Sequence, residues 1–270
     1  MFDRSGHALL SAYQVAGLRI FSASLVMLPF ALRAWRRIPA SSRGTIVLAG
    51  LMGNFFPAFL FCVAETKIDS ALAASVNSLT PIFAILVGAI VFKKAVPPQQ
   101  IWGVAIGFVG CMVLFAGKLS ATGSQILYSC LVLIAALFYA LNGQMIRQRL
   151  AGIASTDIAA LAFAALLLPS GLILLYSGYF SLPILHTPYL HASLAAALLG
   201  VLGTAFASII FYILVKKAGP IFASMVTYGI PFVAIGWGFY FGETIGWVQI
   251  MGLLLILAGV YISNFTRNKG

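Results

Sequence analysis

The sequence has 270 residues, of which 62% are hydrophobic and 8% are charged. Soluble globular domains carry about 25% charged residues, so this composition excludes an ordinary soluble domain. In a soluble protein the net charge of +11 would suggest nucleic-acid binding, but here the basic residues stand between apolar runs, where they set membrane orientation and bind no nucleic acid.

Apolar runs of about 20 residues recur along the whole chain, and a run of this length crosses a bilayer as a helix. The runs are continuous, not alternating, so helices are predicted in preference to a β-barrel. We therefore expect an all-α, polytopic membrane helix bundle with nine transmembrane helices. In chain order the expected spans are 12–34, 44–64, 70–92, 98–117, 124–146, 156–179, 192–215, 220–241 and 246–265.

The joints between these spans differ in charge. If the spans alternate, twelve basic residues fall on one side and three on the other. Because basic loops stay in the cytoplasm, we predict a cytoplasmic C-terminus, an external N-terminus of this chain, and a place in the cell inner (plasma) membrane. The twelve are Arg33, Arg36, Arg37, Arg43, Lys93, Lys94, Arg147, Arg149, Lys216, Lys217, Arg267 and Lys269.

The two halves of the chain resemble each other. At a shift of 150 residues twelve identical residues coincide, and at a shift of 149 four more do, which indicates internal duplication. Four of these pairs are Gly50/Gly200, Pro81/Pro231, Gly103/Gly252 and Gly110/Gly259.

The copies are unequal, because the span at 124–146 has no counterpart before residue 1. We expect a first repeat at 1–117 with four helices and a second at 124–266 with five, from a ten-helix ancestor whose opening helix is missing here. A five-helix unit reverses its orientation on repetition, so the copies are predicted to be inverted-topology repeats. Such repeats are associated with alternating-access transport around a midplane site.

Two stretches resemble a known family. The residues LGVLGTAFASIIFY at 199–212, a proline in the next span, and GETIGWVQIMGLLLILAG at 242–259 resemble the EamA-type repeat of the drug/metabolite transporter superfamily. In that repeat Gln follows a Gly-Glu pair by six residues and glycines follow by nine and sixteen; here these are Glu243, Gln249, Gly252 and Gly259. The run ALFYALNGQMIRQRL at 136–150 is similar to the opening helix of the family's second repeat.

The resemblance covers nearly the whole chain and implies ten helices, with a substrate cavity enclosed by the first four helices of each repeat. Two departures stand out: Lys94 takes the place of the expected Glu in the first repeat, and the opening helix is missing. A chain without one cavity-lining helix also fits an alternative, a truncated membrane scaffold or paralogue that does not transport.

The five acidic residues all lie at or beyond span ends, so the sequence does not predict proton coupling through a buried acid. No motif or paired carboxylates typical of an enzyme are found, and we predict that the protein is not an enzyme. Cys62, Cys111 and Cys130 match no metal-ligand spacing, and His186 and His191 lack companion ligands, so neither metal nor cofactor is expected.

Arg19 is the one charge within an apolar run. It either clamps an anionic substrate group or extends along its helix to the outer headgroups, and we favour the second because it lies within about two turns of the helix start.

Polar residues at matching places in the two copies are the candidate substrate-binding residues. Asn54 matches Thr204, and Asn77 matches Thr227. The alternative role is helix-to-helix hydrogen bonding, worth about 0.6 kcal/mol each on average. The neighbouring aromatic residues Phe55 and Tyr228 and the fifth-span residues Tyr139 and Asn142 are added to these pairs. The predicted site then comprises Asn54, Phe55, Asn77, Tyr139, Asn142, Thr204, Thr227 and Tyr228.

The matched prolines Pro81 and Pro231 are predicted hinge or gating positions, with static packing as the alternative. Small residues usually mark close helix contacts in membranes, which is the first interpretation of the glycines; a homodimer face is the second. The packing glycines are Gly103, Gly110, Gly252 and Gly259.

Together these features predict an inner-membrane permease or exporter of small organic metabolites that works by alternating access. Its expected partners are the lipid bilayer and a small-molecule substrate. The substrate, the direction of transport and any coupling ion stay open.

Overall fold

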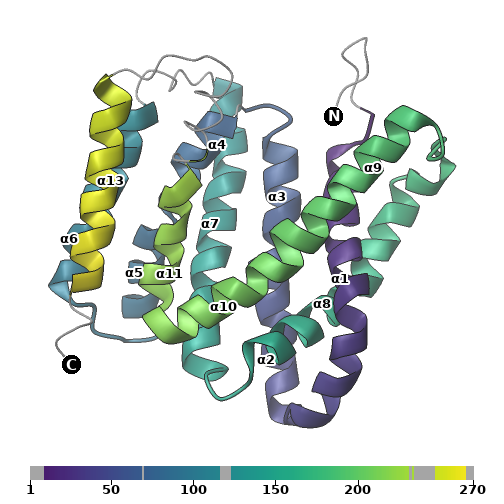
Figure 1. The fold of residues 1–270 in the computed structure, drawn as a ribbon, viewed down its shortest axis with the longest axis horizontal. Helices are drawn as coiled ribbons and strands as arrows, with labels where there is room; N and C mark the ends of the chain where they lie inside the picture. The colour runs from purple at the N-terminus through teal and green to yellow at the C-terminus, as the bar shows by residue number, and fades with distance from the viewer. Residues whose placement is uncertain (1–8, 69, 116–122, 231–232, 234–246, 266–270) are drawn as a thin grey trace. The chain divides into compact units, whose positions relative to one another are not determined.

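The computed structural model describes residues 9–68, 70–115, 123–230, 233 and 247–265, and these residues form helices and turns with no strand among them (Figure 1). The α-helices are α1 (Ala12–Arg37), α2 (Ala40–Gly50), α3 (Phe56–Ala64), α4 (Ser70–Asn77), α5 (Thr80–Ile90), α6 (Pro98–Phe115), α7 (Gly123–Arg149), α8 (Ser155–Tyr176), α9 (Thr187–Gly200), α10 (Ala207–Ala218), α11 (Pro220–Ser224) and α13 (Trp247–Phe265). Two π-helical segments, η1 (Leu51–Phe55) and η4 (Val201–Phe206), and two 3-10 segments, η3 (Tyr179–Ser181) and η5 (Met225–Gly229), interrupt them.

The all-helical membrane architecture expected from the sequence is confirmed. Six helices are long and apolar enough to cross a membrane: Ala12–Arg37, Ala40–Ala64, Leu72–Ile90, Gln125–Arg149, Ser155–Tyr176 and Thr187–Ala218. Two shorter apolar helices, Pro98–Val113 and Ile250–Ser263, fall where two further spans were expected. Of the span predicted at 220–241, the second half lies almost entirely outside the described residues, as does Pro231.

Local signals set the helix ends. Ser11 caps α1 by accepting the Gln14 backbone N–H at 3.2 Å, while the Gln14 side-chain oxygen accepts the Ser11 N–H at 2.9 Å. The same glutamine donates from Nε2 to the Ser177 carbonyl at 2.9 Å, which ties the start of α1 to the end of α8. Gly219 has a φ of 90° between α10 and α11, a conformation that glycine adopts without a steric penalty.

The chain folds into two compact units, and each combines segments from both halves of the sequence. Unit 1 comprises residues 1–66 and 145–213, and unit 2 comprises 67–144 and 214–270. The compact units therefore cut across the sequence repeats.

In unit 1, α1 lies along α8 and α9. Small residues allow the close approach: a methyl group on Gly17 would come within 3.0 Å of the Leu174 side chain. At Gly200 the approach is closer still, because the space that a Cβ would need is taken by the Arg19 carbonyl and the Ser22 hydroxyl. Backbones in this unit therefore touch where glycine permits it.

In unit 2, α6 and α13 form the most closely packed pair. A methyl group on Gly103 would lie 2.6 Å from the Gly259 carbonyl oxygen, and one on Gly110 would lie 2.8 Å from the Gly252 carbonyl oxygen. In the duplication Gly103 matches Gly252, and Gly110 matches Gly259. Gly103 of α6 therefore contacts the residue that matches Gly110, and Gly110 contacts the residue that matches Gly103. The two helices therefore cross antiparallel, with the same residues of each copy at the crossing.

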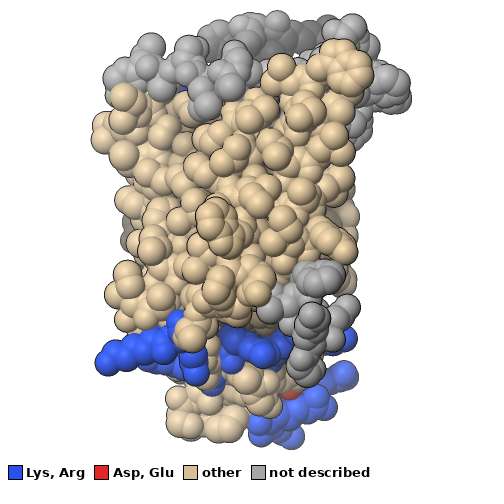
Figure 2. Space-filling model, turned by 90° about the vertical axis from the view of Figure 1, so that its left-hand side faces the viewer, with Lys and Arg blue, Asp and Glu red and all other residues tan. Residues whose placement is uncertain are grey.

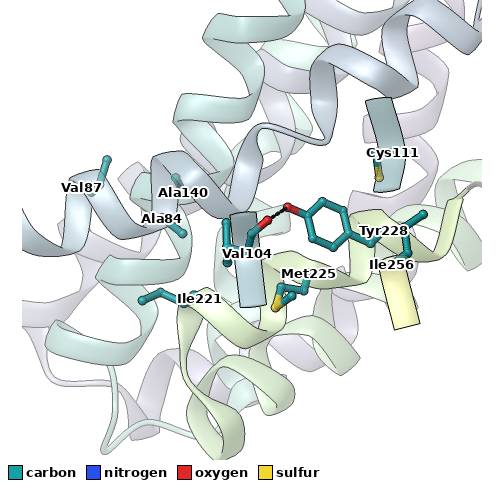
Figure 3. Close-up of a cluster of buried hydrophobic side chains, with 9 residues drawn as sticks. All are labelled: Ala84, Val87, Val104, Cys111, Ala140, Ile221, Met225, Tyr228 and Ile256. Atoms are coloured by element: carbon teal, nitrogen blue, oxygen red, sulfur yellow. Dashed lines mark hydrogen bonds between the residues drawn. The ribbon is translucent and has the colours of Figure 1, made fainter. Parts of the chain in front are cut away.

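The apolar core of unit 2 surrounds Tyr228 (Figure 3). Its ring lies among Val104, Cys111, Met225 and Ile256, and it occupies the space beside Gly107.

On the face that α6 and α13 present, apolar side chains dominate, and the Lys and Arg side chains gather at one end (Figure 2). This distribution is the one that a lipid-facing surface with a charged border requires.

Candidate functional site

The duplication extends to defects in the helices. The π-helical segments η1 and η4 begin at Leu51 and Val201, 150 residues apart, which is the register of the sequence repeat. A π segment inserts an extra residue into a helix and is frequent at functional sites. Both segments belong to unit 1, and they contain the predicted site residues Asn54, Phe55 and Thr204.

Asn54 is buried, and its amide binds the other copy within unit 1. The amide nitrogen donates to the Tyr212 hydroxyl at 3.1 Å, and the amide oxygen accepts the Ser208 hydroxyl at 2.7 Å. Both partners come from α10. Sequence reasoning did not include them, although Thr204, Ser208 and Tyr212 recur every four residues and so share one helix face.

Thr204 is also buried, and its hydroxyl accepts a hydrogen bond from Arg19 Nη2 at 3.4 Å. The Arg19 guanidinium also contacts the Cys62 thiol. Arg19 thus points toward η4 and α3.

These contacts show how the two copies pair in unit 1. Asn54 of η1 binds Ser208 and Tyr212 of α10, while Arg19 of α1 joins Thr204 of η4 to Cys62 of α3. Helices from the two copies therefore pack against each other around η1 and η4 within unit 1.

Phe55 belongs to a group of aromatic rings in unit 1. Its ring centroid lies 4.9 Å from that of Phe59 and 5.7 Å from that of Phe56. Tyr13 of α1 extends the group, with its centroid 6.4 Å from Phe59. The side chain of Phe55 is half-buried, so one part of the ring packs and another part is accessible.

A second matched defect occurs in unit 2. The 3-10 segment at Met225–Gly229 corresponds to residues 75–79, which comprise the end of α4 and the turn at 78–79 before α5. There the Ser78 N–H donates to the carbonyls of Ala74 at 3.0 Å and Ser75 at 3.2 Å, and the Leu79 N–H donates to the Val76 carbonyl at 3.1 Å, so α-helical and 3-10 hydrogen bonds are mixed. Both copies are therefore broken just before the repeated proline.

Pro81 lacks an N–H, which leaves the Asn77 carbonyl without its usual helical donor. The Thr80 hydroxyl compensates, at 2.7 Å from the Asn77 carbonyl and 3.1 Å from its side-chain oxygen. Asn77 is buried, and its amide oxygen is thus engaged locally.

The other predicted residues of unit 2 differ in their surroundings. Thr227 donates to the Ser224 carbonyl at 2.9 Å within its own turn. Tyr228 is fully buried in the core and donates to the Val104 carbonyl at 3.0 Å (Figure 3). Tyr139 is half-buried on α7 and has an interaction partner.

Asn142 on α7 is 2% exposed, and its amide oxygen has no hydrogen-bond partner among the described residues. A buried unpaired acceptor is costly, so native structures rarely keep one without a ligand, water or functional reason. Nearby on the same helix Gln144, not among the predicted residues, donates to the Ala84 carbonyl at 2.9 Å and occupies the space beside Gly88. The sequence feature that could have identified Gln144 is a glutamine within an apolar run.

The titratable groups near the unit 1 segments are few. Glu65 follows α3, and partial desolvation raises the pKa of its carboxyl while the Arg19 charge opposes that rise. Among the described residues no three His, Cys, Asp or Glu side chains come together in a way that could hold a metal ion. The described polar groups of these segments are hydroxyls, amides and one guanidinium, groups that can form hydrogen bonds with a polar ligand.

The chain was compared with known proteins. The EamA-like transporter family model matches residues 2–116 and 126–265. Protein PagO of Salmonella typhimurium is 24% identical over 221 residues, which cover 78% of this chain and 71% of that protein. A probable amino-acid metabolite efflux pump of Salmonella typhimurium is 25% identical over 268 residues, which cover 93% of this chain and 85% of that protein. A solved crystal structure shares the fold with a TM-score of 0.72 at 17% identity, covering 95% of this chain and 90% of the other.

Proposed function

The chain belongs to the EamA-like transporter family, and from this premise we propose that it carries small organic metabolites across the inner membrane by alternating access of two inverted repeats. That it is a multi-pass membrane protein of a transporter family follows from its helices and its family. The mechanism, the substrate and the direction are the proposal.

One observation supports alternating access most directly. Each copy carries a π segment at the matching position and an irregular turn before the repeated proline, a two-residue turn at 78–79 in the first copy and a 3-10 segment at Met225–Gly229 in the second. Discontinuous helices that retain such defects are typical of transporters, where they line the site or act as hinges. The hinges of the proposal are the breaks next to Pro81 and Pro231.

The proposed cargo is an amino acid or a similar metabolite, and the proposed direction is export. The support is the relative that is named a probable amino-acid metabolite efflux pump. The amides, hydroxyls and aromatic rings of the predicted site suit a small polar molecule with an apolar part. The proposed binding residues remain Asn54, Phe55, Asn77, Tyr139, Asn142, Thr204, Thr227 and Tyr228, of which Asn142 has an unpaired acceptor.

Two further proposals concern the molecule in its membrane. The excess of basic residues at alternate joints supports a cytoplasmic C-terminus and an external N-terminus.

A homodimer is proposed from the glycine-rich helices, but in unit 2 those glycines already contact each other within one chain. Size-exclusion chromatography with light scattering in detergent distinguishes a dimer from a monomer.

The experiment for the transport proposal is counterflow in proteoliposomes. Vesicles are loaded with one unlabelled amino acid at a time, and uptake of the labelled form is measured; this readout needs neither a coupling ion nor a known orientation. We expect Asn142→Ala to lower counterflow about tenfold, or ~1.4 kcal/mol, by removing one hydrogen bond to the cargo.

The matched control is Gln99→Ala, because Gln99 is an exposed amide at the start of α6. It should leave counterflow unchanged. If no amino acid or related metabolite exchanges through folded protein, the scaffold hypothesis replaces the transporter. If exchange occurs and Asn142→Ala equals the control, transport stands and the site assignment fails.

A further inference from the structure

We propose that Arg19 binds the carboxylate of the carried metabolite and thereby selects anionic or zwitterionic cargo. The inference rests on the proposed transport function and adds a residue that the matched-pair reasoning left out. Its evidence is the position of one guanidinium in unit 1.

The guanidinium of Arg19 has more donors than partners. Of its five N–H groups, one from Nη2 reaches Thr204 at 3.4 Å, a long hydrogen bond, and another group contacts the weakly accepting thiol of Cys62. Nε is buried and has no partner in the part of the chain that the structure describes. A buried charged donor left unpaired is costly, and an anionic ligand would remove that cost.

Charge balance points the same way. Among the described residues no ion pair joins Arg19 to a carboxylate, although the charges of Arg19 and Glu65 act on each other. Positive charge inside a membrane protein normally has a counter-ion or faces a pathway. Here no carboxylate of the described residues forms an ion pair with Arg19, and the side chain is half-buried, so an anionic solute can pair with it.

The chemistry favours a carboxylate. The planar fork of a guanidinium matches the two oxygens of a carboxylate and forms paired, charge-assisted hydrogen bonds. The polar groups next to it already have partners: Asn54 holds Ser208 and Tyr212, and the Thr204 hydroxyl donates to the Leu199 carbonyl at 3.4 Å. Arg19 therefore has the free donors that a carboxylate needs.

The backbone of Arg19 is also fixed. Its carbonyl lies against Gly200, the last residue of α9 directly before the π segment η4, while its guanidinium contacts Thr204 within η4. Arg19 therefore connects a ligand charge with one of the two matched helix defects. This gives the ligand a way to bias the conformation of that defect.

Cys62 provides a test that does not depend on transport, because it contacts the guanidinium. In purified protein with the other two cysteines replaced (C111A and C130S), the rates of Cys62 modification by an anionic and a cationic methanethiosulfonate reagent are compared. Each rate is divided by the rate at which the same reagent modifies a small free thiol, which corrects for the intrinsic reactivity of the two reagents. The anionic reagent should react about tenfold faster, because a fixed positive charge concentrates anions locally.

Variants of Arg19 and Glu65 complete the test. R19Q should abolish the charge preference, R19K should keep most of it, and E65Q should increase it. An equal rate for both reagents in the parent protein, a preference that survives R19Q, or failure of the anionic reagent to modify Cys62 would each overturn the proposal. Thermal unfolding of R19Q and R19K in detergent confirms that the proteins compared are folded.

The ligand class is tested by protection of Cys62. Amino acids are compared with their amides, which lack the carboxylate, and with inorganic phosphate. Slowing of modification by the acids alone, lost in R19Q and retained in R19K, supports the carboxylate site. Equal protection by the amides, protection by phosphate alone, or no protection overturns it. Since protection measures binding, it can succeed where counterflow fails, and the two proposals fail separately.

Discussion

Asn54 shows how a single side chain joins the two copies. Its amide gives one hydrogen bond to Tyr212 and accepts another from Ser208, all within unit 1. In lipid such bonds between helices contribute modestly, because the unfolded helices also find partners. Their effect is to fix which residues face each other, more than to stabilise the fold.

Replacing Tyr212 by Phe should destabilise the protein by about 0.6–1.7 kcal/mol, because it removes the partner of the buried Asn54 amide nitrogen. Thermal or denaturant unfolding in detergent measures the loss. The matched control is Tyr176→Phe, since Tyr176 is 90% exposed and should tolerate the change. Equal stability of the two variants would contradict the bond between Asn54 and Tyr212.

Gly259 allows α13 to approach α6. A methyl group there would come 2.5 Å from the Gly103 carbonyl oxygen and 2.5 Å from the Gly107 nitrogen, which are backbone atoms that cannot rotate away. Gly259→Ala should therefore separate the two helices and lower the free energy of unfolding by about 1–3 kcal/mol, the range for overpacking.

The matched control for that change is Gly44→Ala on α2. A Cβ at Gly44 meets nothing within 4 Å, so the change should be neutral or should stabilise the helix by up to about 1 kcal/mol. If both variants unfolded alike, the close contact of α6 and α13 would not contribute to stability.

At the scale of helices, irregular segments matter more than the regular ones. In α4–α5 the break at 78–79 precedes Pro81, and Thr80 satisfies the freed Asn77 carbonyl. The structure thereby accommodates the proline without leaving an unpaired carbonyl. Both interpretations of Pro81, a hinge or static packing, predict this compensation, but they predict different effects of replacing the proline.

Pro81→Ala distinguishes them. As a hinge, its replacement should lower the counterflow rate several-fold while stability is kept or raised, because an added N–H lets α4 and α5 form one stiffer helix. The control is Pro98→Ala at the exposed start of α6, which should change neither quantity. Unchanged counterflow with Pro81→Ala would favour static packing.

For the whole molecule, the basic joints predict the orientation proposed above. A fluorescent protein that matures only in the cytoplasm, fused after Gly270, should be bright, and a periplasmic phosphatase fused there should be inactive. Moving the charge bias tests the cause: Lys93→Gln with Lys94→Gln should weaken the orientation, whereas Lys67→Gln should not. An active phosphatase fused after Gly270 of the parent protein would contradict the predicted orientation.

Much of the fold could be predicted from the sequence. Composition and run length placed eight predicted spans where the structure has helices, because a bilayer demands long apolar segments whose backbone groups bond internally. Duplication predicted two copies of one helical unit, and the matched helices α6 and α13 meet through matched glycines, Gly103 with Gly259 and Gly110 with Gly252. The family resemblance is confirmed by a family model that matches both halves.

The candidate site was predictable only in part. Matched positions drew attention to Asn54 and Thr204, but the same pattern could not say that Asn54 binds Ser208 and Tyr212 while Asn142 keeps an unpaired oxygen. Nor could the length of an apolar run reveal a π segment, since the extra residue alters the hydrogen bonds without altering the composition.

Sequence alone determined that this protein spans a membrane, that it is a doubled helical unit, and which family it resembles, because these depend on composition and on residue order along one chain. Tertiary structure decided which polar groups are already satisfied and that Arg19 points at Thr204 and Cys62. The physical reason is that a side chain's partners come from helices distant in sequence, and packing alone brings those helices together.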